Sequence, residues 1–108
     1  MSNKINWKPE TFGNHLAVHW AMEQREFLYR EGGTTHDLVV LMTIASHMSH
    51  DAWSGWLSNA TVAREALCNV RSVQRSVANL VDFKKLRIVG QHASGANMYK
   101  LTMDSESR

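Results

Sequence analysis

Apolar residues recur every three or four positions along the first half of the chain, the spacing of helices that bury one face. A first helix is predicted from about Asn14, a reasonable N-cap, to Arg30, because Gly32-Gly33 ends the pattern. A second helix opens at Thr34 or Thr35 with Asp37 in its first turn, where a negative charge suits the helix dipole. The apolar stripes of these two helices are Leu16, Trp20, Phe27 and Leu28, and then Leu38, Leu41, Met42, Ala45 and Met48.

Two further helices are predicted with only a short break between them. Ser58 is a candidate N-cap for a third helix, which extends to Leu67. Cys68 and Asn69 form the break, and Asn69 is the N-cap of a fourth helix. The buried stripe of this fourth helix is predicted to be Val70, Val73, Val77, Leu80 and Val81. Its opposite face carries Arg71, Ser72, Gln74, Arg75, Ala78 and Asn79.

After Lys85 the apolar period changes from that of a helix to that of a strand. Residues 86–89 and 98–103 alternate between apolar and polar positions, and residues 90–97 form a loop between them, which predicts a hairpin. The link 52–57, with Trp53 and Trp56, has room for a short extended piece. The predicted fold class is mainly α with a small β-hairpin, in the order of a winged helix-turn-helix with an extra N-terminal helix.

A length of 108 residues suits one domain, which we place at residues 14–103, after an irregular arm (1–13) and before a flexible tail (104–108). No apolar run approaches the ~20 residues that cross a bilayer, and the N-terminus lacks a secretory signal, so we expect a cytoplasmic protein with no membrane partner. A single cysteine, Cys68, fits a reducing compartment. Without a glycine-rich phosphate loop, a serine elbow or paired catalytic carboxylates, we expect no enzyme, cofactor or small-molecule substrate.

The net charge of +2 conceals an uneven distribution of charged residues. Residues 1–56 carry four Lys or Arg against six Asp or Glu, a net charge of −2. Residues 57–103 carry seven Lys or Arg against two Asp or Glu, a net charge of +5. A basic half joined to an acidic half points to a polyanion partner on one side of the molecule.

The polar face of the fourth helix holds the side chains that are suited to base recognition. The major groove is about 12 Å wide and admits one α-helix, and Arg and Gln side chains form bidentate contacts with guanine or adenine. Arg71 and Arg75 are four residues apart without an acidic residue that would pair with them along the helix. The predicted contacts to double-stranded DNA are Asn69, Arg71, Ser72, Gln74, Arg75 and Asn79, with Lys84, Lys85 and Arg87 as phosphate contacts.

Residues 57–89, LSNATVAREALCNVRSVQRSVANLVDFKKLRIV, resemble winged-helix domains of phage and plasmid replication proteins and regulators. In the sequence pattern of these domains, Leu57-Ser58 corresponds to the residues before the first helix of the motif, and Val62-Ala63 to an apolar pair within it. Residues 69–75 correspond to the turn and the start of the second helix, and residues 80–88 to the segment in which the chain leaves that helix. The resemblance covers roughly residues 34–103. It implies sequence-specific binding of duplex DNA, as a transcriptional regulator or a replication-origin factor of a phage or mobile element.

The chain departs from that pattern at three places. Leu67 replaces the usual turn glycine, and if it stays helical the turn is left to Cys68 and Asn69. Lys84 or Lys85 replaces the usual exit glycine. The wing loop, residues 92–97, contains no Lys or Arg, which argues against a wing contact in the minor groove.

Other functions stay open from the sequence. A winged helix that binds proteins, such as a phage-encoded inhibitor or an assembly adaptor, would show the same pattern, and the chain would also fit the N-terminal part of a larger replication protein. A homodimer is expected, because such DNA-binding proteins usually bind paired half-sites.

Histidines and tryptophans offer two alternative kinds of site. His15 with His19, and His47 with His50, have metal-ligand spacing, but no third ligand accompanies them, so we expect no metal. Four tryptophans could stack on unpaired bases, but they are not interleaved with basic residues along the chain.

Overall fold

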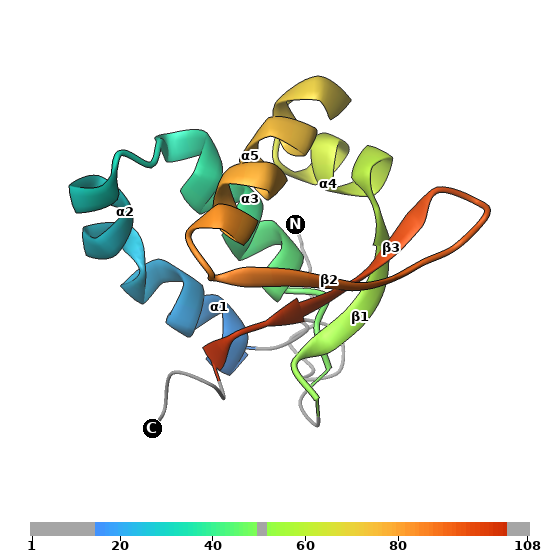
Figure 1. Cartoon of the computed structure of the whole chain (residues 1–108), viewed down its shortest axis with the longest axis horizontal. Helices are drawn as coiled ribbons and strands as arrows, with labels where there is room; N and C mark the ends of the chain where they lie inside the picture. The colour runs from blue at the N-terminus through green and yellow to red at the C-terminus, as the bar shows by residue number, and fades with distance from the viewer. Residues whose placement is uncertain (1–14, 50–51, 104–108) are drawn as a thin grey trace, which may run out of the picture.

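The computed structural model describes residues 15–49 and 52–103. These residues fold mainly into helices, with one small antiparallel sheet (Figure 1), as the sequence predicts. The elements, in chain order, are α1 (His15–Glu23), α2 (Arg25–Glu31), α3 (Thr35–Ala45), β1 (Ser54–Ser58), α4 (Asn59–Glu65), α5 (Val70–Asp82), β2 (Leu86–Gln91) and β3 (Ala96–Leu101). The predicted arm, the Asn14 cap and the tail lie outside the described residues.

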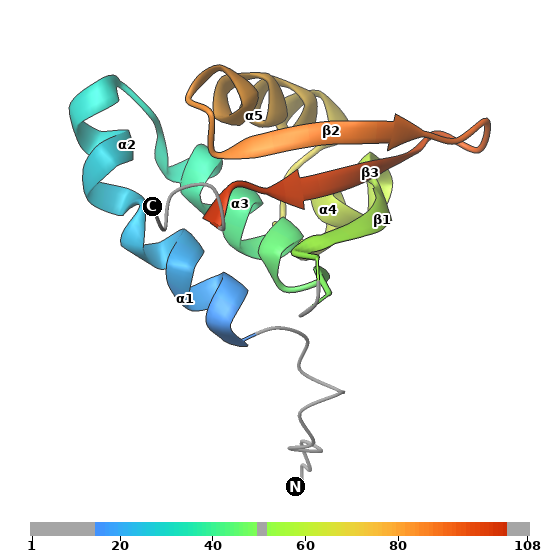
Figure 2. The same cartoon turned by 60° about the horizontal axis from the view of Figure 1, so that its bottom comes forward.

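The single N-terminal helix that the sequence predicts is two helices, because the hydrogen-bond ladder is interrupted at Gln24. The amide of Gln24 bonds to the carbonyl of Ala21, three residues back, at 3.1 Å. Two side chains bond to backbone carbonyls next to the interruption. The side-chain amide of Gln24 donates to the Trp20 carbonyl, and the Arg25 guanidinium donates to the Met22 carbonyl, both at 2.9 Å. Figure 2 shows α2 turning away from the axis of α1 at this point.

The predicted start of α3 is confirmed, and its first turn is closed by a capping box. The Thr34 hydroxyl accepts from the Asp37 amide at 3.1 Å, and the Asp37 carboxylate accepts from the Thr34 amide at 3.0 Å. Within the preceding turn, Gly32 has a φ of +87°, a left-handed conformation that glycine adopts without steric cost. These two features fix where α2 ends and α3 begins.

Both N-caps predicted for the next two helices are confirmed. The Ser58 hydroxyl accepts from the Thr61 amide at 3.1 Å, and the Asn69 side-chain oxygen accepts from the Ser72 amide at 2.8 Å. The expectation that Leu67 stays helical is wrong. Leu67 has a φ of +59°, so it takes the left-handed place of the usual turn glycine itself.

Leu67 and Lys84 each occupy the left-handed position of a Schellman motif. After α4, the Cys68 amide donates to the carbonyl of Ala63 at 2.9 Å. After α5, the Lys85 amide donates to that of Leu80 at 3.0 Å, with Lys84 at a φ of +63°. Lys84, rather than Lys85, therefore stands at the place of the exit glycine.

The predicted hairpin is longer than expected, and β1 extends it to a sheet of three strands in the order β1-β3-β2, all antiparallel. The connecting loop comprises residues 92–95 instead of the predicted 90–97, and Gly95 turns the chain there at a φ of +97°. One face of the sheet closes the core against the helices through Leu57, Leu86, Tyr99 and Leu101. No described helix is long and apolar enough to span a membrane.

Candidate nucleic-acid interface

Helix α5 is strongly two-faced. Val73, Ser76, Val77 and Leu80 are buried on one side, against α3, α4 and β2. Val70 and Val81, which the sequence places on the buried stripe, are 40% and 38% exposed, because they flank that stripe at its two ends. Only this narrow stripe of α5 packs against the core, and most of the remaining helix positions are exposed.

Arg71, Gln74 and Arg75 are all exposed on the open side of α5. Within residues 15–49 and 52–103, neither guanidinium makes a hydrogen bond or an ion pair. The three residues belong to the first two turns of the helix, so they are close together on one surface. The structure thus presents together the three side chains that the sequence assigns to base recognition.

Two further residues predicted to contact DNA, Asn69 and Ser72, form the N-terminal cap of α5. The Asn69 side-chain oxygen and the Ser72 amide are used up in the cap. The Ser72 side chain is half-buried, whereas Asn69 remains exposed. The cap leaves the Asn69 side-chain NH₂ group as a donor at the N-terminal end of α5.

Asn79 and Lys85 do not belong to the open surface. The Asn79 amide donates to both carboxylate oxygens of Asp37 at 3.4 Å, across the contact between α5 and α3. Lys85 is 7% exposed, and its ammonium lies 4.2 Å from the centre of the Phe27 ring. The sequence pattern could not separate Lys85 from its neighbour Lys84, because the difference depends on a helix that is distant along the chain.

Lys84 and Arg87 are both exposed, but they are on different parts of the molecule. Lys84 follows the C-terminus of α5 directly. Arg87 pairs with Lys100 on the face of the sheet away from the helices, because its neighbours Leu86 and Ile88 take the other face. Of the three predicted phosphate contacts, Lys84 alone is exposed next to an end of α5.

A groove of about 390 Å³ separates the second half of α5 from the sheet. Its lining residues are Asn59, Gln74, Val77, Ala78, Val81, Asp82, Ile88, Asn97 and Tyr99. At its floor the Tyr99 hydroxyl donates to Asn59 at 2.8 Å and accepts from the Asn97 amide at 3.2 Å. Burial raises the pKa of Tyr99 above its ordinary value of 10.0, and the bond from Asn97 partly offsets this rise. Asn59 and Asn97 were missed from the sequence, since only the sheet brings them together.

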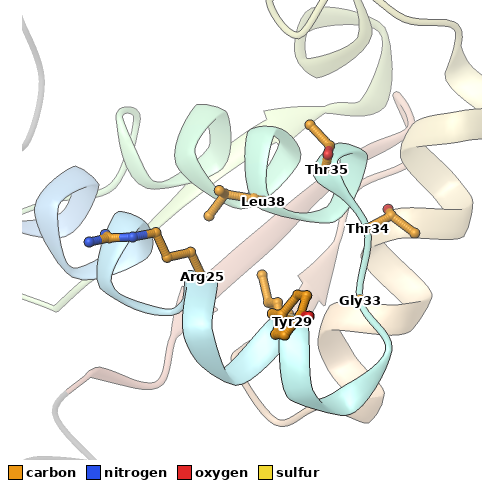
Figure 3. Close-up of a pocket in the computed structure, with 7 residues that line it drawn as sticks. Arg25, Tyr29, Gly33, Thr34, Thr35 and Leu38 are labelled. Atoms are coloured by element: carbon orange, nitrogen blue, oxygen red, sulfur yellow. The ribbon is translucent and has the colours of Figure 1, made fainter.

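A smaller cleft of about 170 Å³ lies between α2 and the start of α3 (Figure 3). Two of its polar side chains already have partners: Arg25 bonds to the Met22 carbonyl, and Thr34 belongs to the capping box of α3. In Figure 3, Arg25 extends away from Thr34 and Thr35. The only charged side chain among the described residues that line the cleft is therefore directed away from its two threonines.

Two histidines of the described chain pair with acids. His19 lies 3.0 Å from Glu23, and His47 lies 2.7 Å from Glu65, which links the end of α3 to the end of α4. Among residues 15–49 and 52–103, no three His, Cys, Asp or Glu side chains come together as a metal site. His50 lies outside these ranges.

Residues 34–84 match a family described as a helix-turn-helix domain. Comparisons with curated proteins and with solved structures found no match. The matched segment begins at the cap of α3 and ends at Lys84, which follows the C-cap of α5. In such domains the second helix of the motif enters the major groove of DNA, and α5 holds that position here. The chain therefore carries a helix-turn-helix DNA-binding domain of winged arrangement, in which α4 and α5 form the motif and β2 and β3 form the wing.

Proposed function

We propose that this protein binds a specific duplex-DNA sequence, with α5 in the major groove and Arg71, Gln74 and Arg75 in contact with base edges. The observation that supports this proposal is the surface of α5, where these three side chains lie together and neither arginine has a partner within the described residues. Arginine forms bidentate bonds with guanine, and glutamine forms them with adenine. No acidic residue lies three or four positions from Arg71 or Arg75, so an ion pair along the helix does not account for these arginines.

The phosphate contacts of the proposal are Lys84 and Asn69, which are exposed beyond the two ends of α5. Asn69 is the N-cap of α5 and Lys84 follows its C-cap, Phe83, so they would help to fix the register of the helix on the DNA. Asn79 and Lys85 are left out, because their polar groups are engaged with Asp37 and Phe27.

The biological role that we propose is regulation of transcription or action at a replication origin, in a phage or mobile element. Its support is the resemblance of residues 57–89 to the winged helices of phage and plasmid replication proteins and regulators. Both roles need the same duplex binding. Selection of bound fragments from random DNA would supply the site, and the position of that site at a promoter or an origin would distinguish the two roles.

The selected site then permits a direct test of base recognition. Arg75→Ala should weaken binding to that site by about 1–3 kcal/mol and relax selectivity at one base pair, because a bidentate contact is lost. Arg30→Ala, which removes the same charge from the exposed end of α2, is the matched control. Wild-type affinity of Arg75→Ala in gel-shift titrations would remove Arg75 from base recognition.

A salt titration tests whether the partner is DNA at all. Affinity for duplex DNA should fall steeply as salt concentration rises, because phosphate contacts release counterions. If mixed genomic fragments are not bound at low salt, a winged helix that binds proteins becomes the better explanation.

We also propose a homodimer, with the outer side of α1 as its contact. Leu16 and Met22 are exposed apolar residues there, at 67% and 42%, and winged helices commonly bind two half-sites as dimers. Sedimentation equilibrium of the wild type and of Leu16→Glu is the test. A monomeric wild type at concentrations that saturate the DNA site would contradict it.

A further inference from the structure

The face of the sheet that turns away from the helices carries an aromatic and basic surface. Side chains alternate between the two faces along each strand, and Leu57, Tyr99 and Leu101 point into the core. Their neighbours therefore point outward. In Figure 2 the strands lie in front of α3, α4 and α5, with this outer face toward the viewer. The register groups Trp56 with Met98 and Gly90, and Ser54 with Lys100 and Arg87, in two adjacent rows.

Trp56 forms a supported platform on this outer face. It is 51% exposed, although it lies in the middle of a strand. Its ring reaches across Met98 to Gly90, where an added Cβ would lie 3.4 Å from the Trp56 Cη2 atom. The His92 ring is nearly perpendicular to the indole, at 80°, with the ring centres 6.1 Å apart. Contacts with the neighbouring strands and with His92 hold the indole in place, so it would lose little conformational freedom when a second ring stacks on it.

The charged side chains of the three strands have one sign. The three strands contain Arg87 and Lys100 and no acidic residue. The Arg87 side chain is exposed, and its guanidinium makes no hydrogen bond or ion pair within residues 15–49 and 52–103. The Lys100 ammonium donates to the Ala52 carbonyl at 2.7 Å, which keeps its positive charge beside the first residues of β1. The basic residues that are distant from Trp56 in the sequence are thus brought to the next row by the sheet register.

We propose that this outer face binds single-stranded nucleic acid, with one unpaired base stacked on Trp56 and a neighbouring phosphate held by Arg87. Every base has a π face, so a flat aromatic platform beside a cation binds single strands without strong sequence preference. An acidic side chain would use the cation but would not stack on the indole, whereas each nucleotide supplies both a base and a phosphate. The surface is separate from the exposed face of α5, so this proposal does not depend on duplex recognition.

Fluorescence anisotropy of the full chain with labelled oligo(dT) of about 15 nucleotides tests the proposal, at a length that covers one small binding site. Trp56→Ala should weaken oligo(dT) binding at least about fivefold, whereas Trp56→Phe should retain most of it, because phenylalanine still stacks. Arg87→Ala should weaken it and reduce its salt dependence. Tyr29→Ala and Arg30→Ala, which change an exposed tyrosine and an exposed arginine on α2, are the matched controls.

The same variants separate this site from that of α5. Trp56→Ala should leave binding of random duplex DNA unchanged, whereas Arg71→Ala with Arg75→Ala should lose duplex and keep oligo(dT). Failure of the wild type to bind duplex DNA, with oligo(dT) binding intact, would contradict the function proposed for α5 and leave the single-strand site standing. Equal oligo(dT) affinity of the wild type and Trp56→Ala, or displacement of oligo(dT) by polyglutamate at equal charge concentration, would overturn the single-strand proposal.

A measurement on the wild type covers the case in which Trp56→Ala fails to fold. Oligonucleotides that carry 5-iodouracil crosslink under ultraviolet light to an aromatic ring stacked on the modified base. Mass spectrometry should place the crosslink on Trp56. A crosslink only at another aromatic residue, or none under conditions in which the oligonucleotide is bound, would overturn the proposal.

Discussion

Leu67 and Lys84 show how one backbone angle sets the boundaries of the DNA-binding motif. Both residues have a positive φ at the end of a helix, where glycine is the usual residue because it lacks a Cβ atom. Leu67 also exposes 91% of its surface, so its side chain contributes little packing. The cost of the left-handed conformation is about 1–2 kcal/mol for a non-glycine residue. Two Schellman motifs maintain these conformations and fix where α5 begins and ends.

Leu67→Gly should stabilise the protein. The substitution removes the left-handed strain and sacrifices little burial, while the added freedom of glycine in the unfolded chain offsets part of the gain, so we expect about 0.5–1 kcal/mol. Urea unfolding would measure this change. Ala78→Gly, at an exposed position with ordinary helical geometry in α5, should instead destabilise by about 1 kcal/mol. A loss of stability in Leu67→Gly would show that its left-handed conformation carries no strain.

Tyr99 makes stability depend on pH in the alkaline range. Burial raises the pKa of Tyr99 in the folded state above 10.0, so the folded protein keeps the phenol proton at a pH where the unfolded chain loses it. The free energy of unfolding should therefore fall as pH rises through about 10. Tyr99→Phe removes the titrating group and should show a shallower decline between about pH 9 and pH 11. Parallel declines in urea unfolding of the two proteins would contradict this.

At the scale of elements, the orientation of α5 depends on α3. Asp37 is 1% exposed and serves two structures: it completes the capping box of α3 and accepts from Asn79 in the middle of α5. A buried carboxylate is tolerated only when its oxygens have hydrogen-bond donors. The same side chain thus starts one helix and positions the other, and the sequence indicates only the first of these roles.

A double-mutant cycle should detect the link between α3 and α5. Asp37→Ala and Asn79→Ala should be non-additive by at least about 0.5 kcal/mol, because each removes the partner of the other. Asp37→Ala combined with Ser58→Ala, at the cap of α4, should be additive. Urea unfolding of the four proteins in each cycle gives the coupling energies. Additivity in the first cycle would mean that the bonds at 3.4 Å contribute nothing.

At the scale of the whole molecule, most of the positive charge of residues 57–103 separates onto two regions. Arg71 and Arg75 lie on α5 and Lys84 just beyond its C-terminus, whereas Arg87 and Lys100 lie on the outer face of the sheet. Lys85 faces the aromatic ring of Phe27. The net charge of residues 57–103 is therefore larger than the charge on any one binding surface, because the fold directs these cations to three different parts of the molecule.

Lys84 and Lys85 offer a matched test of that separation. Lys84→Gln should weaken binding to all duplex sequences and reduce the salt slope by about one, since one phosphate contact is lost. Lys85→Met, which keeps an unbranched side chain against Phe27, should leave the slope unchanged. Binding titrations at several salt concentrations give both slopes. Equal salt slopes for the two variants would contradict the assignment of Lys84, and not Lys85, as a phosphate contact.

The winged fold and the face of α5 that carries Arg71, Gln74 and Arg75 could be predicted from the sequence. Ser58 and Asn69 cap the helices that they precede, and apolar spacing identifies α3, α4, α5 and the hairpin, because caps and periodicity act over a few residues. The break at Gln24 was missed, since the apolar stripe continues across it. The third strand was only suggested, because β1 is short and becomes a strand by pairing with β3.

The sequence by itself determined the local features: where helices start, which face of α5 is polar, and where the period changes from helix to strand. Only the tertiary structure decided which polar groups are available. In the folded chain Asn79 donates to Asp37, the Lys85 ammonium lies over the Phe27 ring, and Trp56 and Arg87 occupy adjacent rows on the outer face of the sheet. The physical reason is distance along the chain: capping and periodicity depend on neighbouring residues, whereas burial, pairing and register depend on residues that only folding brings together.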